Sequence, residues 1–182
     1  MKKKIYIGLG VILIVIIGFA GYTAFTTRSH SPSKTTEFSH EGLDITVVYC
    51  QPFKKGRQIF GDSQSGALLP YGKYWRLGAN EATEITFSKN ITFAGQPVNA
   101  GTYRMYAMPG STTWQVALNS QLGQWGAMEP DHTMDVVKVD VPVETAPAET
   151  EQFTINFGSS ADGARMDLVW DKTLVTVPII VQ

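Results

Sequence analysis

The sequence contains a single cysteine among its 182 residues, Cys50. One thiol excludes an internal disulfide, so the fold must be stabilised by its hydrophobic core. Cys50 lies in an alternating apolar run, and no neighbouring base is evident that would activate a thiolate. We therefore interpret it as a small buried hydrophobe. It is not a lipoprotein anchor either, because it lies far beyond the N-terminal apolar run.

A basic surface is also lacking. Three of the 15 lysines and arginines lie at positions 2–4, ahead of the apolar run, and the other 12 stand against 16 aspartates and glutamates. The chain beyond the run therefore carries a formal charge of −4, the difference between those 12 and 16 residues. A mildly acidic domain without a basic stripe is a poor match for nucleic acid, which we do not expect as a partner.

No motif in the chain assigns catalysis, a metal or a cofactor. Residues 61–66 (Gly-Asp-Ser-Gln-Ser-Gly) are similar to a serine-protease loop, but two positions differ and no histidine has the matching context. Asp131, His132 and Asp135 form the one cluster with metal-like chemistry, yet their spacing follows no metal motif. We interpret both stretches as polar loops and expect no catalytic residue, no metal and no cofactor, which makes an enzyme the less favoured class.

One long apolar run is present, over residues 5–25. Its 21 uncharged residues would form a helix of about 30 Å, the thickness of a bilayer core. Lysines precede the run and only Arg28 follows closely, so the N-terminus is expected inside the cell. We predict that residues 1–26 are a transmembrane anchor or uncleaved signal sequence in the cytoplasmic (inner) membrane. The pattern Gly18-Phe19-Ala20 leaves a cleaved signal peptide open.

Two further regions follow the anchor. Residues 27–37 are polar and predict a flexible tether. Residues 38–182 alternate with a period of two, in roughly nine or ten short segments separated by glycine and proline turns. This pattern predicts an all-β domain, an antiparallel β-sandwich. The orientation of the anchor places this domain in the periplasm or the extracellular space. Residues 144–151, rich in Pro, Ala, Thr and Glu, are expected to be a surface connection.

Residues 71–83 (Tyr-Gly-Lys-Tyr-Trp-Arg-Leu-Gly-Ala-Asn-Glu-Ala-Thr) are the densest stretch of groups that pack or bind. Arg76 and Glu81 could form a charge-assisted pair across a tight turn at Gly78. Alternatively, Arg76 holds a carboxylate or phosphate of a ligand while Asn80 or Glu81 orients it. The sequence leaves both interpretations open.

Aromatic residues suggest a second way of binding. A platform on which the apolar faces of sugars stack could be formed by Tyr71, Tyr74, Trp75, Trp114 and Trp125. Trp114 belongs to the apolar face of a strand and is expected in the core, whereas Trp125 lies in a loop beside Gly126 and is the better exposed. Packing in the core or under a loop is the alternative for each of these rings.

Several segments together resemble a bacterial domain-of-unknown-function family, number 2911. They are residues 48–52, 55–61 and 71–83, followed by 100–103, 109–110, 114–119 and 125–126. The most specific is the block Trp-Arg-x-Gly-Ala-Asn-Glu-Ala-Thr, and the resemblance covers nearly the whole domain. It implies an exported all-β protein and brings no known activity, cofactor or catalytic residue. Family members usually have a small polar residue in place of Cys50.

These observations favour a noncatalytic module of the cell envelope that binds a ligand or protein. The membrane, through residues 5–25, is one partner, and an envelope glycan, a small ligand or an envelope protein is the other. The predicted ligand-binding residues are Tyr71, Trp75, Arg76, Asn80, Glu81 and Trp125. Two alternatives remain: an envelope hydrolase that uses Glu81 with Asp62 or another carboxylate, and a structural subunit of an envelope assembly.

Overall fold

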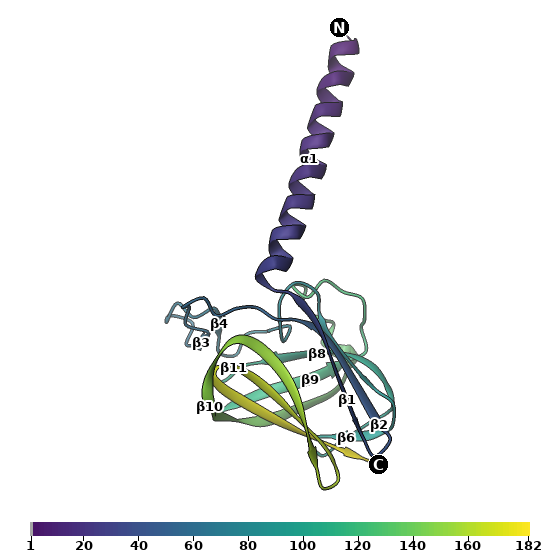
Figure 1. The fold of residues 1–182 in the computed structure, drawn as a ribbon, viewed down its shortest axis with the longest axis vertical. Helices are drawn as coiled ribbons and strands as arrows, with labels where there is room; N and C mark the ends of the chain where they lie inside the picture. The colour runs from purple at the N-terminus through teal and green to yellow at the C-terminus, as the bar shows by residue number, and fades with distance from the viewer. Residues whose placement is uncertain (1) are drawn as a thin grey trace.

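The computed structural model describes residues 2–182, except for the side chains at 2–5, 7, 9, 11, 20, 24 and 25. The side chains of lysines 2–4, on which the predicted orientation of the anchor rests, are therefore not among the described ones. Helix α1 (Lys2–His30) stands away from the rest of the chain as a single rod (Figure 1). Within it, Ile12–His30 is long and apolar enough to cross a membrane. The apolar side chains from Ile12 to Ile17 are exposed, so this part of α1 is not a core helix.

The rest of the chain is dominated by one antiparallel sheet of nine strands, which confirms the predicted all-β class. The strands follow one another in the spatial order β1 (Ser33–His40), β2 (Leu43–Cys50), β5 (Thr83–Phe87), β8 (Gly101–Met108), β9 (Thr113–Asn119), β10 (Asp135–Ser160), β11 (Gly163–Val181), β6 (Ile91–Phe93) and β7 (Gln96–Val98). Two short strands, β3 (Phe60–Gly61) and β4 (Leu69–Pro70), pair in parallel outside this sheet.

The sheet folds over on itself through its two longest strands. The first part of β10 pairs with β9 as far as Pro142, and the remainder pairs with β11. The two halves of the sheet then face one another: Phe87 of β5 contacts Phe93 of β6, and the Tyr49 hydroxyl accepts a hydrogen bond of 2.9 Å from the Ile155 amide. Strand alternation places one side chain in two toward the space between the halves, which creates the core.

The core follows the period of two that the sequence shows. On three strands, alternate residues are buried: Ile45, Val47, Tyr49, Phe153, Ile155, Met166, Leu168 and Trp170. Phe157, which the same alternation on β10 predicts to be buried, is only partly buried. Aromatic rings gather at one end of the core, where Trp75 lies within 6 Å of the ring centroids of Trp114, Phe153 and Trp170. This cluster forms the base on which the site described below is built.

Two segments differ from their predicted structure. Residues 33–37, expected within a flexible tether, form most of β1, because each residue from Ser33 to His40 pairs with β2. Residues 144–151, expected to be a surface connection, continue β10 as strand. Register shifts between Thr145 and Thr154 accommodate the irregular composition there, since a bulge absorbs residues that a regular ladder excludes.

Candidate functional site

The segment over residues 71–83 is held by backbone contacts from several directions. Its Tyr71 amide donates to the Gly61 carbonyl, and Trp75 exchanges two backbone hydrogen bonds of 2.8 Å with Ala107 of β8. The Trp75 indole N–H donates to the Gly78 carbonyl at 3.0 Å, so the segment turns back on its own ring. The segment then runs into β5 at Thr83.

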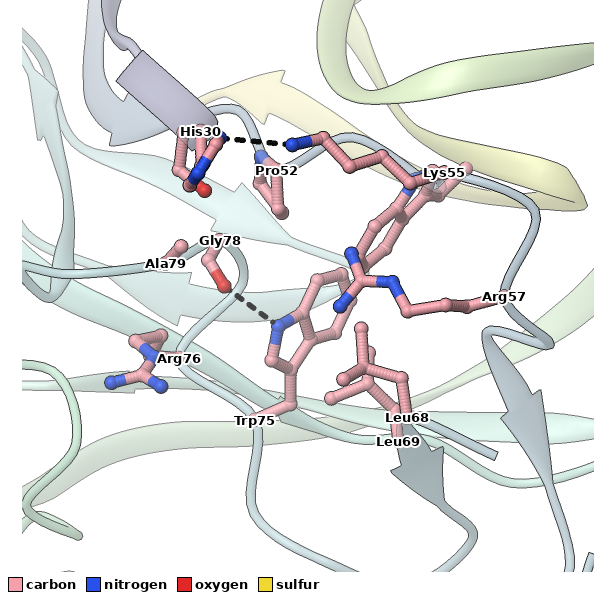
Figure 2. A pocket seen from close by; sticks show the side chains of 12 residues that line it. His30, Pro52, Lys55, Arg57, Leu68, Leu69, Trp75, Arg76, Gly78 and Ala79 are labelled. Atoms are coloured by element: carbon pink, nitrogen blue, oxygen red, sulfur yellow. Dashed lines mark hydrogen bonds between the residues drawn. The ribbon is translucent and has the colours of Figure 1, made fainter. Parts of the chain in front are cut away.

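A hollow of about 500 Å³ opens above this turn (Figure 2). The rings of Trp75 and Trp170 contribute to its lining, stacked at 5.7 Å and 24°. The full set of lining residues is His30, Ser31, Pro52, Lys55, Arg57, Leu68, Leu69, Trp75, Arg76, Gly78, Ala79 and Trp170. The hollow therefore lies where the end of α1, the segment 52–57 and the segment 75–79 meet. We call it the cation hollow.

None of the described residues that line the cation hollow is acidic. The Lys55 ammonium contacts the imidazole Nδ1 of His30 at 2.9 Å, and the Arg57 guanidinium donates to the backbone carbonyls of Phe53 and Lys54. Neither cation forms an ion pair with an acidic side chain among the described residues, although Glu151 accepts a hydrogen bond of 2.8 Å from the Lys55 backbone amide. In Figure 2, Lys55 and Arg57 approach from one side and Arg76 lies at the other. Clustered charge of one sign against apolar walls concentrates the local potential.

Arg76 has no hydrogen bond or ion pair with any of the described residues. Burial, together with the like charge of Arg104, lowers the pKa of Arg76 below its ordinary value. Tyr74 and Cys50 act in the opposite direction, but no Asp or Glu is among the groups that shift this pKa. Arg76 is therefore a partly buried cation without a carboxylate partner among the described residues.

A second arginine nearby is also without an acidic partner. Arg104 of β8 is fully buried, and its Nη2 donates to the Tyr74 hydroxyl at 2.5 Å and to the Met128 carbonyl. Its Nε and Nη1 have no partner among the described residues. Arg104 is not among the residues of the cation hollow, but its charge adds to the positive potential around Arg76.

The predicted pairing of Arg76 with Glu81 is not present. Glu81 forms an ion pair with Arg28 at the end of α1 and accepts a hydrogen bond of 3.4 Å from the Cys50 thiol. Burial, followed by the hydrogen bond to Glu81, raises the pKa of Cys50, which disfavours the thiolate. Arg76 is thus left available for a ligand.

The six residues predicted as a ligand site do not form one site. Trp75 and Arg76 line the cation hollow, where Trp75 is a core ring that presents only 4% of its surface. Asn80, Glu81 and Trp125 line a different hollow of about 300 Å³ beside the end of α1. Tyr71 is half-buried and is absent from the described lining of both hollows. A common aromatic platform of Tyr71, Trp75 and Trp125 is therefore not formed.

The carboxylates that a hydrolase would need have other roles. Glu81 and Glu84 line a hollow of about 330 Å³ with Trp125, whereas Asp62 is not part of it. Glu84 accepts a hydrogen bond of 3.1 Å from the Gly123 amide, so both carboxylates hold neighbouring structure together. Among the described residues, no group of three or more His, Cys, Asp and Glu side chains is arranged to hold a metal ion. The cluster of Asp131, His132 and Asp135 instead surrounds the short 3-10 turn η1 (His132–Met134).

Of the twelve residues that line the cation hollow, only Trp75 and Arg76 were predicted as site residues. Among those that the sequence did not single out are Lys55 and Arg57, which lie in the cationic run 54–57, and Trp170, which is a core residue. The site could have been predicted if the sequence had shown that two cationic turns, 54–57 and 73–76, lie close together in space. The sequence does not show this, because about 20 residues separate the two turns along the chain.

Comparisons with known proteins give one family and no individual relative. No curated protein and no solved structure matches the chain. One family model does match, over residues 31–179, a range that begins just after α1 and extends into the last residues of β11. The match includes the cation turn 54–57 and the whole of the segment 71–83. The chain belongs to the family described as protein of unknown function DUF2911.

Proposed function

We propose that this chain is a membrane-tethered binding module of the cell envelope, and that its ligand carries a carboxylate or phosphate group. The observation that carries the proposal is the cation hollow, where Lys55, Arg57 and Arg76 line a space without an acidic residue on a domain of net negative charge. In this proposal α1 stays in the cytoplasmic membrane and the domain lies on its outer side.

The chemistry of the hollow suits a particular kind of anion. A guanidinium offers several N–H donors in a planar fork, which matches the geometry of a carboxylate or a phosphate. Leu68 and Leu69, together with the largely buried rings of Trp75 and Trp170, supply an apolar wall beside the cations. A ligand with an anionic group next to an apolar or ring portion fits both features, as an acidic envelope glycan or a small organic acid would.

Binding is favoured over hydrolysis by the state of the acidic residues. A glycosidase or related hydrolase needs two carboxylates facing its substrate. In this chain the cation hollow contains none, and Glu81 and Glu84 are engaged by Arg28, Cys50 and Gly123. We therefore place the function in recognition.

The test is thermal unfolding of the full chain in detergent against a panel of inorganic phosphate, organic acids and acidic envelope glycans. A ligand of the folded state raises the melting temperature with its concentration. Replacing Arg76→Gln removes one charged hydrogen-bonding partner, worth about 1.5–3 kcal/mol, so the affinity should fall by roughly 10- to 100-fold. The unliganded protein should remain as stable as wild type, since Arg76 has no partner to lose.

Lys73→Gln is the matched control, because Lys73 is an exposed cation of the same segment that does not line the hollow. The proposal predicts that Lys73→Gln retains the ligand-induced shift and that Arg76→Gln and Lys55→Gln lose it. A panel without any shift, or equal shifts in Arg76→Gln and Lys73→Gln, would contradict the proposal.

A further inference from the structure

The loop that carries Trp125 lies beside the end of α1. Trp125 shares a hollow with Thr23, Thr27 and Arg28, which belong to the last two turns of the helix. Those turns lie within Ile12–His30, the stretch that is long and apolar enough to cross a membrane. Figure 1 shows that the loop after β9 rises at the end of the domain from which α1 leaves. Trp125 is thus level with the point where the apolar run ends and Thr26, Thr27 and Arg28 begin.

The tip of this loop is apolar and uncharged. Residues 121–128, which we call the Trp125 loop, contain no Asp, Glu, Lys or Arg. Three of its large apolar side chains face solvent, with exposed fractions of 42% for Leu122, 50% for Trp125 and 53% for Met128. The other three tryptophans of the chain are at most 4% exposed. Tryptophan is enriched where a protein meets the boundary between lipid and water, because its ring is apolar and its N–H is polar.

Several backbone groups of the Trp125 loop are paired within the domain. The Gly126 amide donates to the Asn80 carbonyl at 3.0 Å, and the Gly126 carbonyl accepts from the Tyr74 hydroxyl at 2.9 Å. Arg104 donates to the Met128 carbonyl, and Glu84 accepts from the Gly123 amide. A loop that enters a membrane boundary must have its polar backbone groups paired, since lipid offers no partners. These pairs lower the cost of placing the loop at such a boundary, and its three large apolar side chains remain exposed.

We infer that the Trp125 loop inserts into the interfacial layer of the bilayer that α1 crosses, with Leu122, Trp125 and Met128 in contact with lipid. The inference rests on the part of the proposed function that keeps α1 as an anchor. It is independent of what the cation hollow binds. It implies that one face of the domain lies against the membrane, and that the cation hollow, which His30 and Ser31 also line, opens close to the bilayer surface.

The test uses the full chain in phospholipid vesicles, with bromine attached either near the carbonyl end or near the methyl end of the acyl chains. Bromine quenches tryptophan fluorescence on contact, and α1 contains no tryptophan that would interfere. Wild type should be quenched by bromine near the carbonyl end, and less by bromine near the methyl end. In Trp125→Phe, which changes an exposed side chain, the quenching should disappear, because the remaining tryptophans are buried in the domain.

A matched control places a tryptophan at the opposite end of the domain. Asp162 is exposed in the turn between β10 and β11, which Figure 1 shows at the end far from α1. Asp162→Trp in the Trp125→Phe background should be quenched by iodide in the water and not by brominated lipid.

Extraction of the vesicles with alkaline carbonate tests the membrane anchor separately from the insertion of the Trp125 loop. A chain that leaves the vesicles overturns the anchor, and the inference with it. A chain that stays in the vesicles, but shows equal bromine quenching in wild type and Trp125→Phe, overturns the inference alone.

Discussion

Two glycines allow the segment 71–83 to pack against its neighbours. Gly78 has a backbone φ of +153°, and a Cβ placed on it would lie 2.6 Å from the Cys50 carbonyl oxygen. A Cβ on Gly126 would lie 2.5 Å from the Arg76 side chain and 2.8 Å from the Glu81 backbone. Both positions exclude a side chain because another segment occupies the space. Gly78 in addition has a conformation that other residues rarely adopt.

Gly78→Ala should therefore destabilise the domain. The unfavourable φ costs about 1–3 kcal/mol. The clash with Cys50 backbone adds to that cost, because a carbonyl of a paired strand has little freedom to move. Each 1 kcal/mol lowers the melting temperature of a domain of this size by about 2–4 °C, so thermal unfolding of the full chain measures the effect.

Gly66→Ala is the control for Gly78→Ala. Gly66 also has a positive φ, of +74°, but a Cβ there would have no neighbour within 4 Å. Gly66→Ala should have the cost of the positive φ without a steric clash. The melting temperature of Gly78→Ala should therefore be lower than that of Gly66→Ala. Equal melting temperatures for the two variants would show that the approach to Cys50 is unimportant.

Individual side chains also show why the candidate site was only partly predictable. The sequence offered both Trp75 and Trp125 as possible ligand-binding rings. The structure buries Trp75 among four other rings and exposes half of Trp125. The difference is tertiary, since it depends on what β9, β10 and β11 place above each ring. Arg76 was correctly singled out as a residue to test, but Arg28, the partner of Glu81, lies 53 residues away in the chain.

At the scale of elements, the end of the loop after β9 is fastened by one carboxylate. Asp135 accepts hydrogen bonds of 2.8 Å from Asn119 and 2.7 Å from Tyr106, and Lys138 lies 3.2 Å away. Burial acts to raise the pKa of Asp135, but these three partners outweigh it and hold that pKa below its ordinary value. The carboxylate thereby joins β8, β9 and the start of β10.

Asp135→Asn should lower the free energy of unfolding at neutral pH by about 1–3 kcal/mol, the value of hydrogen bonds to a charged group. Because the folded-state pKa is depressed, this stabilisation is present above the unfolded pKa of about 4 and is lost as the pH falls through the folded value. Urea unfolding of both proteins across this pH range should therefore show curves that converge on acidification.

The matched control for this prediction is Asp140→Asn, on the same strand. Asp140 is exposed and has a single long hydrogen bond, 3.4 Å from Gln115, so its replacement should have little effect at any pH. A difference between Asp135→Asn and wild type that stays constant down to acidic pH would contradict the assigned role of the carboxylate.

The strands were more predictable than their lengths. A period of two shows which residues of a strand share a face, and this is a local property of the chain. The inward residues of β10 and β11 follow from it except for Phe157, which is only partly buried. Whether a polar, proline-containing stretch interrupts a strand depends on its partner. Residues 144–151 remain strand because β11 runs alongside them, with a bulge that absorbs the irregularity. Whether residues 144–151 form a strand therefore depends on pairing with β11, and the local sequence pattern carries no information about that pairing.

At the scale of the whole molecule, the structure leaves almost no chain between helix and sheet. Helix α1 ends at His30 and β1 begins at Ser33. Ser31 is buried and its carbonyl accepts from the Asn80 side chain at 3.3 Å, while the Pro32 carbonyl accepts from the Gln51 amide at 2.9 Å. The Arg28–Glu81 pair adds to these contacts, but both side chains are largely exposed, so its contribution is at most about 1 kcal/mol. Backbone contacts and the short connection, more than this ion pair, hold the domain to the helix.

This short junction predicts slow cleavage by trypsin at Lys34, which pairs with Tyr49 in the ladder between β1 and β2. Cleavage there requires β1 to separate locally, and even about 1.4 kcal/mol of opening free energy slows it roughly tenfold. The comparison is a variant with Gly-Ser-Lys-Ser-Gly inserted after Pro32, whose added lysine lies in an unpaired linker. With both chains in vesicles, the inserted site should be cut at least about tenfold faster than Lys34. Equal rates would mean that β1 behaves as the flexible tether that its polar composition suggested. The domain would then be free to turn relative to the membrane, and neither the Trp125 loop nor the cation hollow would be held at its surface.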